Sequence, residues 1–213
     1  MWSLNLERLK PLVRDGVLGS MAIESGTCRG NGTRVLAKEF SRVITIELSE
    51  KLFLSAKARL SGPEFSHVEL RCGDSAETLA NLLPQLPENQ TTFFFLDAHW
   101  SGDSSVDWRD SIWKGYGVDT AHRSKSALLP SGPEQCPLAA ELSEIAGKCR
   151  GPAIILVDDM KNIPEVGPGL KNHGFPGEDW SHLSRSLLMN IVEKRLASSY
   201  LLHDPEQWLL VLS

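Results

Sequence analysis

The sequence predicts an α/β fold in which helices cover both faces of a mostly parallel sheet. Short runs of β-branched or aromatic residues alternate with longer stretches in which apolar residues recur every three or four positions. Two of the short runs, residues 93–96 and 153–157, are apolar throughout, as strands covered on both faces should be. With 213 residues, of which 41% are hydrophobic and 23% charged, residues 1–213 are expected to form a single globular domain.

The expected elements follow one another in the order of a parallel sheet with crossover helices. Strands are predicted at residues 21–23, 43–46, 67–70, 93–96 and 153–157. Helices are predicted near residues 33–40, 50–60, 75–83, 137–148 and 179–195. Two further apolar runs, residues 199–202 and 208–212, are separated by the turn residues Asp204, Pro205 and Glu206, so the chain is expected to end in a hairpin.

The last two predicted helices each have an apolar face. In residues 137–148 and just beyond, the spacing predicts a face that packs on the sheet and consists of Leu138, Leu142, Ile145 and Cys149. In residues 179–195, the same rhythm predicts a face made of Trp180, Leu183, Leu187 and Ile191.

Residues 98–136 interrupt this alternation. The segment is far longer than the roughly 2–6 residues that usually connect a strand to a helix. It contains Trp100, Trp108, Trp113 and Tyr116, whose apolar area favours an ordered lid or substrate-binding insertion over disorder. The alternative is a loop that only covers the core.

The charge of the chain indicates which class of partner to expect. Lys and Arg number 22 and Asp and Glu 27, so the net charge is 22 − 27 = −5, and no long basic run is present. Tight nonspecific binding to nucleic acid or an anionic membrane is therefore not expected, and a small-molecule partner is. No apolar run of about 18 residues and no leader pattern is found, and the four cysteines form no CxxC pair. We expect reduced thiols in a cytoplasmic protein.

A glycine-rich turn follows the first predicted strand. Residues 24–33 read ESGTCRGNGT and lead into a helix, where glycines let the backbone approach a ligand and the helix start offers free N–H groups. A nucleotide-like cofactor fits such a turn, although the spacing differs from the GxGxxG of dinucleotide folds. Glu47, at the end of the second strand, is placed to accept hydrogen bonds from both ribose hydroxyls. Asp74, after the third strand, either binds an exocyclic amine or caps the next helix.

Carboxylates also follow the fourth and fifth predicted strands. Asp97, Asp158 and Asp159 would meet at the carboxyl edge of the sheet, where they repel one another unless a cation intervenes. Oxygen ligands suit Mg²⁺, so these three residues are candidate metal ligands. His99 is a fourth ligand, a general base or a hydrogen-bonding neighbour. The alternative is that each aspartate only caps the turn that follows its strand.

Taken in order, five motifs resemble the class I S-adenosylmethionine-dependent methyltransferases. The motifs are ESGTCRGNGT, IELSE, RCGDSAETL, FFFLDAHWSGD and IILVDDM, and the resemblance covers roughly residues 20–213. The form ExGxxxGxGT and the paired aspartates are most similar to the divalent-cation-dependent O-methyltransferases of the macrocin and catechol types. The resemblance implies a Rossmann-like fold whose mostly parallel, seven-stranded sheet is closed by an antiparallel strand of the C-terminal hairpin.

The resemblance also implies roles for individual residues. The cofactor's amino-acid part would be bound by Glu24, Gly26, Gly30 and Thr33. Its ribose would be bound by Glu47, and its adenine by Asp74 and Ser75. Asp97, Asp158 and Asp159 would hold the metal, which lowers the pKa of a substrate hydroxyl so that it attacks the sulfonium methyl. Asp97 and His99 would be the catalytic residues.

The chain departs from the catechol type at two positions. Asp159 stands where an asparagine is usual, and Ala98 and His99 stand near the place of a lysine, so His99 is a candidate base. Two other functions stay open, a nicotinamide-dependent oxidoreductase and a methyltransferase-like module without activity. Homo-oligomerisation is also open, because an apolar stripe near the start would cover either a second subunit or its own domain; it comprises Trp2, Leu4, Leu6 and Leu9.

Overall fold

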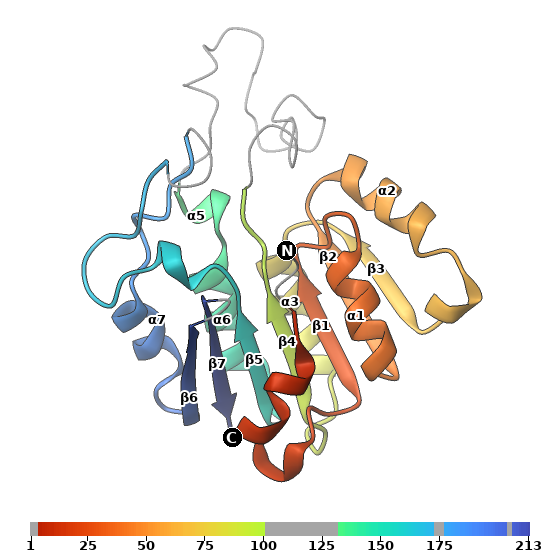
Figure 1. Cartoon of the computed structure of the whole chain (residues 1–213), viewed down its shortest axis with the longest axis horizontal. Helices are drawn as coiled ribbons and strands as arrows, with labels where there is room; N and C mark the ends of the chain where they lie inside the picture. Colours follow the sequence, from red (N-terminus) through yellow and green to blue (C-terminus); the bar gives the residue numbers. More distant parts are fainter. Residues whose placement is uncertain (1–3, 101–131, 173–176, 204–205) are drawn as a thin grey trace, which may run out of the picture.

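Seven strands form one mixed sheet in the computed structural model, which describes residues 4–100, 132–172, 177–203 and 206–213 (Figure 1). The strands are β1 (Met21–Ser25), β2 (Arg42–Glu47), β3 (Val68–Cys72), β4 (Thr92–Leu96), β5 (Ala153–Val157), β6 (Leu196–His203) and β7 (Glu206–Leu212). Their order is β3-β2-β1-β4-β5-β7-β6, with β1 to β5 parallel and β7 antiparallel to both of its neighbours. The predicted fold, including the closing antiparallel strand, is confirmed.

Helices connect the parallel strands. They are α1 (Asn31–Glu39), α2 (Glu50–Arg59), α3 (Ser75–Leu82), α5 (Gly132–Gln135), α6 (Leu138–Lys148) and α7 (Arg185–Val192). Short 3-10 turns lie at Leu6–Arg8, Lys10–Leu12, Arg14–Gly16, Pro63–Phe65, Leu83–Gln85 and Met160–Asn162. None of the helices in the described part of the chain is long and apolar enough to cross a membrane.

Both faces of the sheet are buried, which is why β5 is apolar at every position and β4 at every position after Thr92. Alternate residues such as Ile23, Phe94 and Ile155 belong to a core cluster with α3, α6 and α7. The intervening residues, such as Phe93 and Ile154, belong to a second cluster with α1 and the N-terminal segment. Figure 1 shows α1 on the near side of the sheet and α3 and α6 behind it.

The α6 face was predicted correctly, and the α7 face was wrong. Leu138, Leu142, Ile145 and Cys149 are all buried. Helix α7 begins only at Arg185, after Ser184 caps it by accepting a hydrogen bond from the Leu187 N–H at 3.2 Å. Trp180 and Leu183 are buried in the preceding loop, so a spacing counted from them is out of phase with the helix. The residues that α7 buries are Leu188 and Val192, whereas Leu187 is 43% exposed.

The N-terminal apolar residues pack on their own domain. The buried residues Leu4, Leu6 and Leu9 belong to the same core cluster as Leu36 of α1 and Phe40, which directly follows α1. Trp2 lies outside the described residues. Three of the four stripe residues thus pack against their own domain, and homo-oligomerisation stays a prediction.

Candidate functional site

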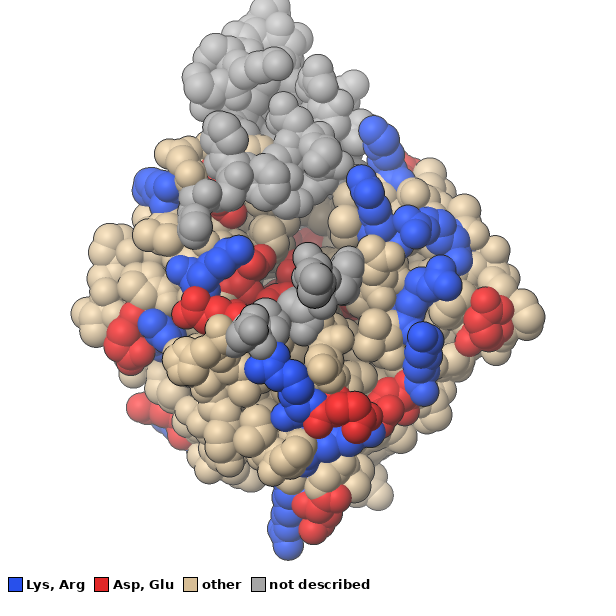
Figure 2. Space-filling model, viewed as in Figure 1, with Lys and Arg blue, Asp and Glu red and all other residues tan. Residues whose placement is uncertain are grey.

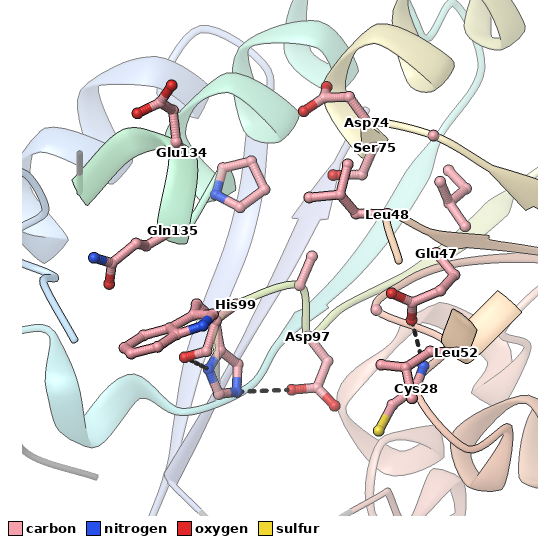
Figure 3. Close-up of a pocket in the computed structure, with 16 residues that line it drawn as sticks. Cys28, Glu47, Leu48, Leu52, Asp74, Ser75, Asp97, His99, Glu134 and Gln135 are labelled. Atoms are coloured by element: carbon pink, nitrogen blue, oxygen red, sulfur yellow. Dashed lines mark hydrogen bonds and ion pairs between the residues drawn. The ribbon is translucent and has the colours of Figure 1, made fainter. Parts of the chain in front are cut away.

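A crevice opens at the carboxyl ends of β1 to β4, where open α/β sheets bind ligands. Its walls include Gly26 after β1, Glu47 of β2, Asp74 and Ser75 after β3, and Asp97 after β4. Figure 3 shows the side chains of Glu47, Asp74 and Asp97 around this one space, although they come from three different strand ends. The parallel topology therefore brings together residues that are far apart in the sequence.

Gly26 brings the turn after β1 against the end of β4. Its φ is +85°, and a Cβ at this position would lie 2.5 Å from the Asp97 carbonyl oxygen. The Gly26 N–H donates to the Ile46 carbonyl at 3.0 Å, which ties the same turn to β2. Only glycine fits this approach, so the turn and the β4 end form one continuous wall of the crevice.

Glu47 is held by two backbone N–H groups. Its Oε2 accepts from Cys28 N at 2.7 Å and its Oε1 accepts from Ser49 N at 2.9 Å. The side chain is nearly buried, and burial raises the pKa of the carboxyl although both N–H groups oppose the change. Each carboxylate oxygen has a second acceptor position, so the fixed group could accept hydrogen bonds from a ligand's paired hydroxyls.

Asp74 and Ser75 lie both at the start of α3 and in the wall of the crevice. Asp74 caps α3, because its Oδ1 accepts from Glu77 N at 2.8 Å. Both residues line the crevice beside Leu48 and Gly73. The capping interpretation and the ligand-binding one are therefore compatible.

Glu24, Gly30 and Thr33 lie behind the wall and do not line the crevice. The buried Glu24 Oε2 accepts from Thr33 Oγ1 at 2.5 Å and from Thr45 Oγ1 at 2.7 Å. Burial raises the pKa of Glu24 to about 7, and the two hydroxyl donors only partly oppose it. Gly30 has a φ of +74° and begins α1. These three residues shape the glycine turn from within, and a direct contact with a cofactor stays a prediction.

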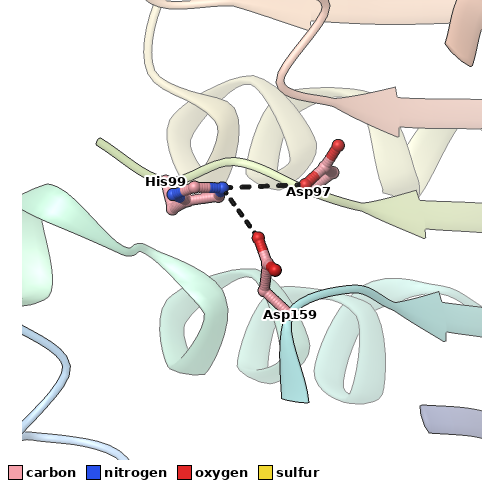
Figure 4. Close-up of side chains that lie close together, drawn as sticks. All are labelled: Asp97, His99 and Asp159. Carbon is pink, nitrogen blue, oxygen red and sulfur yellow. Dashed lines mark ion pairs between the residues drawn. The ribbon is translucent and has the colours of Figure 1, made fainter. Parts of the chain in front are cut away.

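Asp97, His99 and Asp159 form a compact group beside the crevice. His99 Nε2 lies 3.0 Å from Asp159 Oδ2 and 3.9 Å from Asp97 Oδ1 (Figure 4). One donor atom from each residue lies within 4.8 Å of the other two, so the three could hold one metal ion. The His99 ring is also fixed by the Trp100 carbonyl, 3.2 Å from its Nδ1, and by the Trp180 ring at 5.3 Å.

Charge coupling within this group sets the protonation states. Burial lowers the pKa of His99, but the hydrogen bond to Asp159 and the charge of Asp97 outweigh it and raise the pKa to about 9. Burial would raise the pKa of Asp159, yet His99 and Lys161 lower it. Burial and the charge of Asp158 raise the pKa of Asp97 well above its usual value. A bound cation would offset the repulsion between the Asp97 carboxylate and its neighbouring carboxylates.

Asp158 lies near this group without offering it a donor atom. Its Oδ1 accepts from Asp159 N at 2.9 Å and from Gln207 Nε2 of β7 at 3.2 Å. Asp159 itself adopts a φ of +55°, which turns the second aspartate toward His99. Of the predicted metal ligands, the structure brings Asp97 and Asp159 together with His99, and Asp158, which is hydrogen-bonded to Asp159 and acts on Asp97 through its charge, remains a predicted ligand.

The opposite wall comes from the ends of the long connection. Trp100 is buried and its backbone N–H donates to the Gln135 carbonyl at 2.7 Å, so the two ends of the connection meet at the crevice. The sequence did not single out Glu134, Gln135 or Pro137, which also line the crevice. Residues 101–131 lie outside the described residues, including Trp108, Trp113 and Tyr116, so the predicted lid stays a prediction.

Figure 2 shows a row of cations on one side of this face, while elsewhere on it charges of both signs lie next to one another. Lys and Arg side chains gather over α1 and α2, and Asp and Glu side chains lie toward the centre, near the crevice. Exposed cations on the two helices are Arg34, Lys38, Lys51, Lys57 and Arg59. The crevice itself is lined by His99 and by four carboxyl groups, those of Glu47, Asp74, Asp97 and Glu134.

Comparisons with known proteins identify the fold. No protein-family model matches the chain, and no curated protein matches it in sequence. A protein from Pyrococcus horikoshii OT3 is similar in structure with a TM-score of 0.52 and 14% identity, over 98% of this chain and 88% of that one. A candidate O-methyltransferase from Nostoc punctiforme has a TM-score of 0.50 and 11% identity, over 97% of this chain and 55% of that one. The chain has the class I methyltransferase fold. At these identities the similarity defines the fold and no more.

Proposed function

We propose that the protein is an S-adenosylmethionine-dependent methyltransferase that methylates a hydroxyl group of a small or sugar-containing molecule with the help of a divalent cation. One observation carries the proposal: Gly26, Glu47, Ser75 and Asp97 line one crevice across the ends of neighbouring strands. In this arrangement the glycine turn would accommodate the amino-acid part of the cofactor. Glu47 would bind the ribose hydroxyls, and Asp74 and Ser75 would contact the adenine.

The group of Asp97, His99 and Asp159 supports the cation. Two carboxylate oxygens suit Mg²⁺ or Mn²⁺, and an imidazole nitrogen favours a transition metal such as Mn²⁺ over Mg²⁺. A bound divalent cation would lower the pKa of the acceptor hydroxyl. Because His99 has a pKa of about 9, its ring is protonated near neutral pH when the site is free. A second positive charge at Asp97 and Asp159 would lower that pKa, and Nε2 could then act as a ligand or a base.

The chain's own residues would position the reactants. Asp97 stands at the boundary between the cofactor crevice and the acidic group, because it lines the former and belongs to the latter. A hydroxyl bound near His99 would therefore face the end of the crevice where the methyl donor is proposed to lie. Trp100 and Gln135 close this side, so they are the described residues best placed to select the acceptor.

The decisive experiment is a calorimetric titration of the full chain. We expect saturable binding of S-adenosylmethionine and none of a nicotinamide dinucleotide. The reverse result would favour the oxidoreductase, and binding without methyl transfer to any of a panel of catechols and sugar-containing metabolites would favour the inactive module. Absence of S-adenosylmethionine binding would refute the proposal.

The metal part is tested separately by titrating Mn²⁺ and following its electron paramagnetic resonance signal. Asp159→Asn should weaken Mn²⁺ binding by about tenfold or more because a charged ligand becomes neutral. Asp179→Asn is the control, since Asp179 pairs with Lys171 and does not line the crevice. Equal Mn²⁺ affinity in the Asp159 variant and the control would remove this metal site from the proposal while leaving cofactor binding untouched.

A further inference from the structure

Helices α1 and α2, with β2 between them, form a positively charged region of an acidic chain. Residues 29–59 hold 7 of the 22 Lys and Arg and only 3 of the 27 Asp and Glu, so this region carries 7 − 3 = +4 while the whole chain carries −5. Figure 2 shows cations gathered over the two helices. The five exposed cations of these helices are called the cation row: Arg34, Lys38, Lys51, Lys57 and Arg59.

The surroundings of the cation row leave its charge uncompensated. None of its five members forms an ion pair with any residue in the part of the chain that the structure describes. Aromatic rings hold two of them instead. The Arg34 guanidinium lies 5.6 Å from the centre of the Phe65 ring, and the Lys57 ammonium lies 5.7 Å from that of Phe53. A ring orders a cation without neutralising it, so the row keeps its charge for an anionic partner.

An apolar side chain lies among these cations. Leu54 of α2 is 56% exposed. Lys51 and Lys57 lie three positions before and after it, so all three share one face of the helix. Leu52 points the other way and lines the crevice. Helix α2 therefore has the crevice on one side and an apolar side chain flanked by two cations on the other.

The two helices meet, so their cations form one continuous surface. Leu60, which ends α2, lies against Gly30, which begins α1, and a Cβ at Gly30 would be 3.1 Å from Leu60 Cδ1. Arg59 directly precedes this contact on α2, and Arg34 lies one turn beyond it on α1. A surface that extends over two helices fits a macromolecule better than a small anion.

An acidic protein fits this surface better than other polyanions. Protein interfaces combine an apolar centre with a charged or polar rim, which is the arrangement of Leu54 and its neighbours. A nucleic acid backbone offers phosphates without aliphatic side chains that would cover Leu54. The net charge of −5 also opposes the approach of a long nucleic acid or an anionic membrane.

We propose that α1 and α2 form a docking surface for an acidic protein partner, whose Asp and Glu side chains pair with the cation row and whose apolar side chain covers Leu54. A partner bound here would lie at the edge of the crevice, because Leu52 of the same helix lines it. The inference goes beyond the proposed function and does not depend on it, since the charge and exposure of this surface are the same whichever ligand the crevice binds.

The test measures binding of labelled peptides to the full chain by fluorescence anisotropy at low ionic strength, where surface charges act most strongly. One peptide consists of glutamate with leucine at every fourth position, and a second has serine in place of each leucine. Lys51→Glu combined with Lys57→Glu should weaken binding of the leucine peptide by about tenfold or more, because two attractions become repulsions. Leu54→Ser should weaken binding of the leucine peptide by about threefold and leave that of the serine peptide unchanged.

Lys148→Glu combined with Lys194→Glu is the matched control. Both lysines are exposed, and they lie at the end of α6 and just after α7, helices that pack on the opposite face of the sheet from α1. The control should bind the leucine peptide as the unaltered chain does. Circular dichroism checks that every variant is folded.

The outcomes decide between this partner and the others. The inference is overturned if the leucine peptide does not bind saturably, or if the cation-row variant and the control bind it equally well. Tighter binding of polyuridylate than of the leucine peptide would assign the row to nucleic acid. Self-association of the chain that the cation-row variant abolishes would assign it to a second copy, and both results overturn the inference. Calorimetry with S-adenosylmethionine should give the same affinity for the cation-row variant and the unaltered chain, so failure of either proposal is distinguishable from failure of the other.

Discussion

At the residue scale, Glu47 is fixed before any ligand arrives. Its two oxygens already accept the Cys28 and Ser49 N–H groups, so the carboxylate needs no rearrangement to meet two hydroxyls. Glu47→Ala removes both the ligand contact and the acceptor that holds the glycine turn. We expect the dissociation constant of S-adenosylmethionine to rise by about 100-fold or more, measured by calorimetry.

Glu50→Ala is the control for this change. Glu50 is exposed in the first turn of α2, three positions after Glu47, and it does not line the crevice. The affinity of the Glu50→Ala variant for S-adenosylmethionine should match that of the unaltered chain. Equal losses in the two variants would contradict the role of Glu47.

The protonation of His99 gives a second prediction at this scale. Its pKa of about 9 depends on the hydrogen bond to Asp159, so Asp159→Asn should bring the imidazole pKa down by a unit or more, to about 8 or below. Nuclear magnetic resonance titration of the His99 ring in metal-free protein measures this directly. The Asp179→Asn variant should leave the His99 pKa unchanged, and an unaltered value in the Asp159 variant would show that the pair is not formed in solution.

Residues at strand ends were predictable, and the direction of their side chains was not. Glu47, Asp97 and Asp159 lie where the sequence placed them because a parallel strand fixes the position of the residue that follows it. The different roles of Asp158 and Asp159 depend on the positive φ of Asp159 and on Gln207, which is 49 positions away. No local pattern carries that information.

The burial of the acid Glu141 was not predicted, although the sequence holds a signal for it. It lies three positions after Leu138 and four before Ile145, so it shares the buried face of α6. Reading that face only for apolar residues passes over the one acid within it.

At the element scale, the turn between β1 and α1 has no room for a side chain. Gly26→Ala would put a Cβ 2.5 Å from the Asp97 carbonyl in a backbone conformation that alanine disfavours. We expect it to lower the free energy of unfolding by at least about 2 kcal/mol and to weaken cofactor binding. Urea denaturation measures the first effect and calorimetry the second.

Gly147→Ala is the matched control for the glycine substitution. Gly147 lies in α6 and nothing is within 4 Å of the position its Cβ would take. Alanine there should stabilise the protein by roughly 0.5–1 kcal/mol through helix propensity. A Gly26 variant as stable as this control would show that the turn can move away from β4.

Elements with a strong local pattern were predicted best. All seven strands appear at or within a few residues of their expected positions, because each contains a short run rich in β-branched, aromatic or other apolar residues between turn residues. Helix α7 was placed too early, since Trp180 and Leu183 are buried by a loop whose path depends on tertiary contacts such as the Trp180 N–H donating to the Leu170 carbonyl at 3.0 Å. An apolar periodicity indicates which residues are buried, but it does not by itself show that they form a helix.

At the scale of the whole molecule, the buried acids Glu24 and Glu141 and the paired His99 make stability fall as pH rises, whereas His182, whose pKa burial lowers, acts in the opposite direction. Glu24 and Glu141 have folded pKa values of about 7 against an ordinary value of 4.5, and His99 has about 9 against 6.5. Between about pH 4.5 and 9 the folded state therefore binds more protons than the unfolded state. Stability should fall as pH rises through this window, by up to about 1.4 kcal/mol per pH unit for each group that titrates.

Thermal unfolding of ligand-free protein across pH 4.5 to 9 checks this expectation. In Glu141→Gln the fall between pH 4.5 and 7 should become shallower, while the fall between pH 7 and 9, which comes from His99, should persist. Stability that rises with pH across this window would show that these groups are not buried and coupled as the structure has them.

The position of β7 inside the sheet has a consequence for synthesis. Glu206–Leu212 separates β5 from β6 although it follows both in the chain. On the ribosome, β1 to β5 can emerge and pair while the apolar edge of β5 still lacks its neighbour. Nascent chains of this protein should therefore depend on chaperones from the time β5 emerges until β7 has emerged and paired with it.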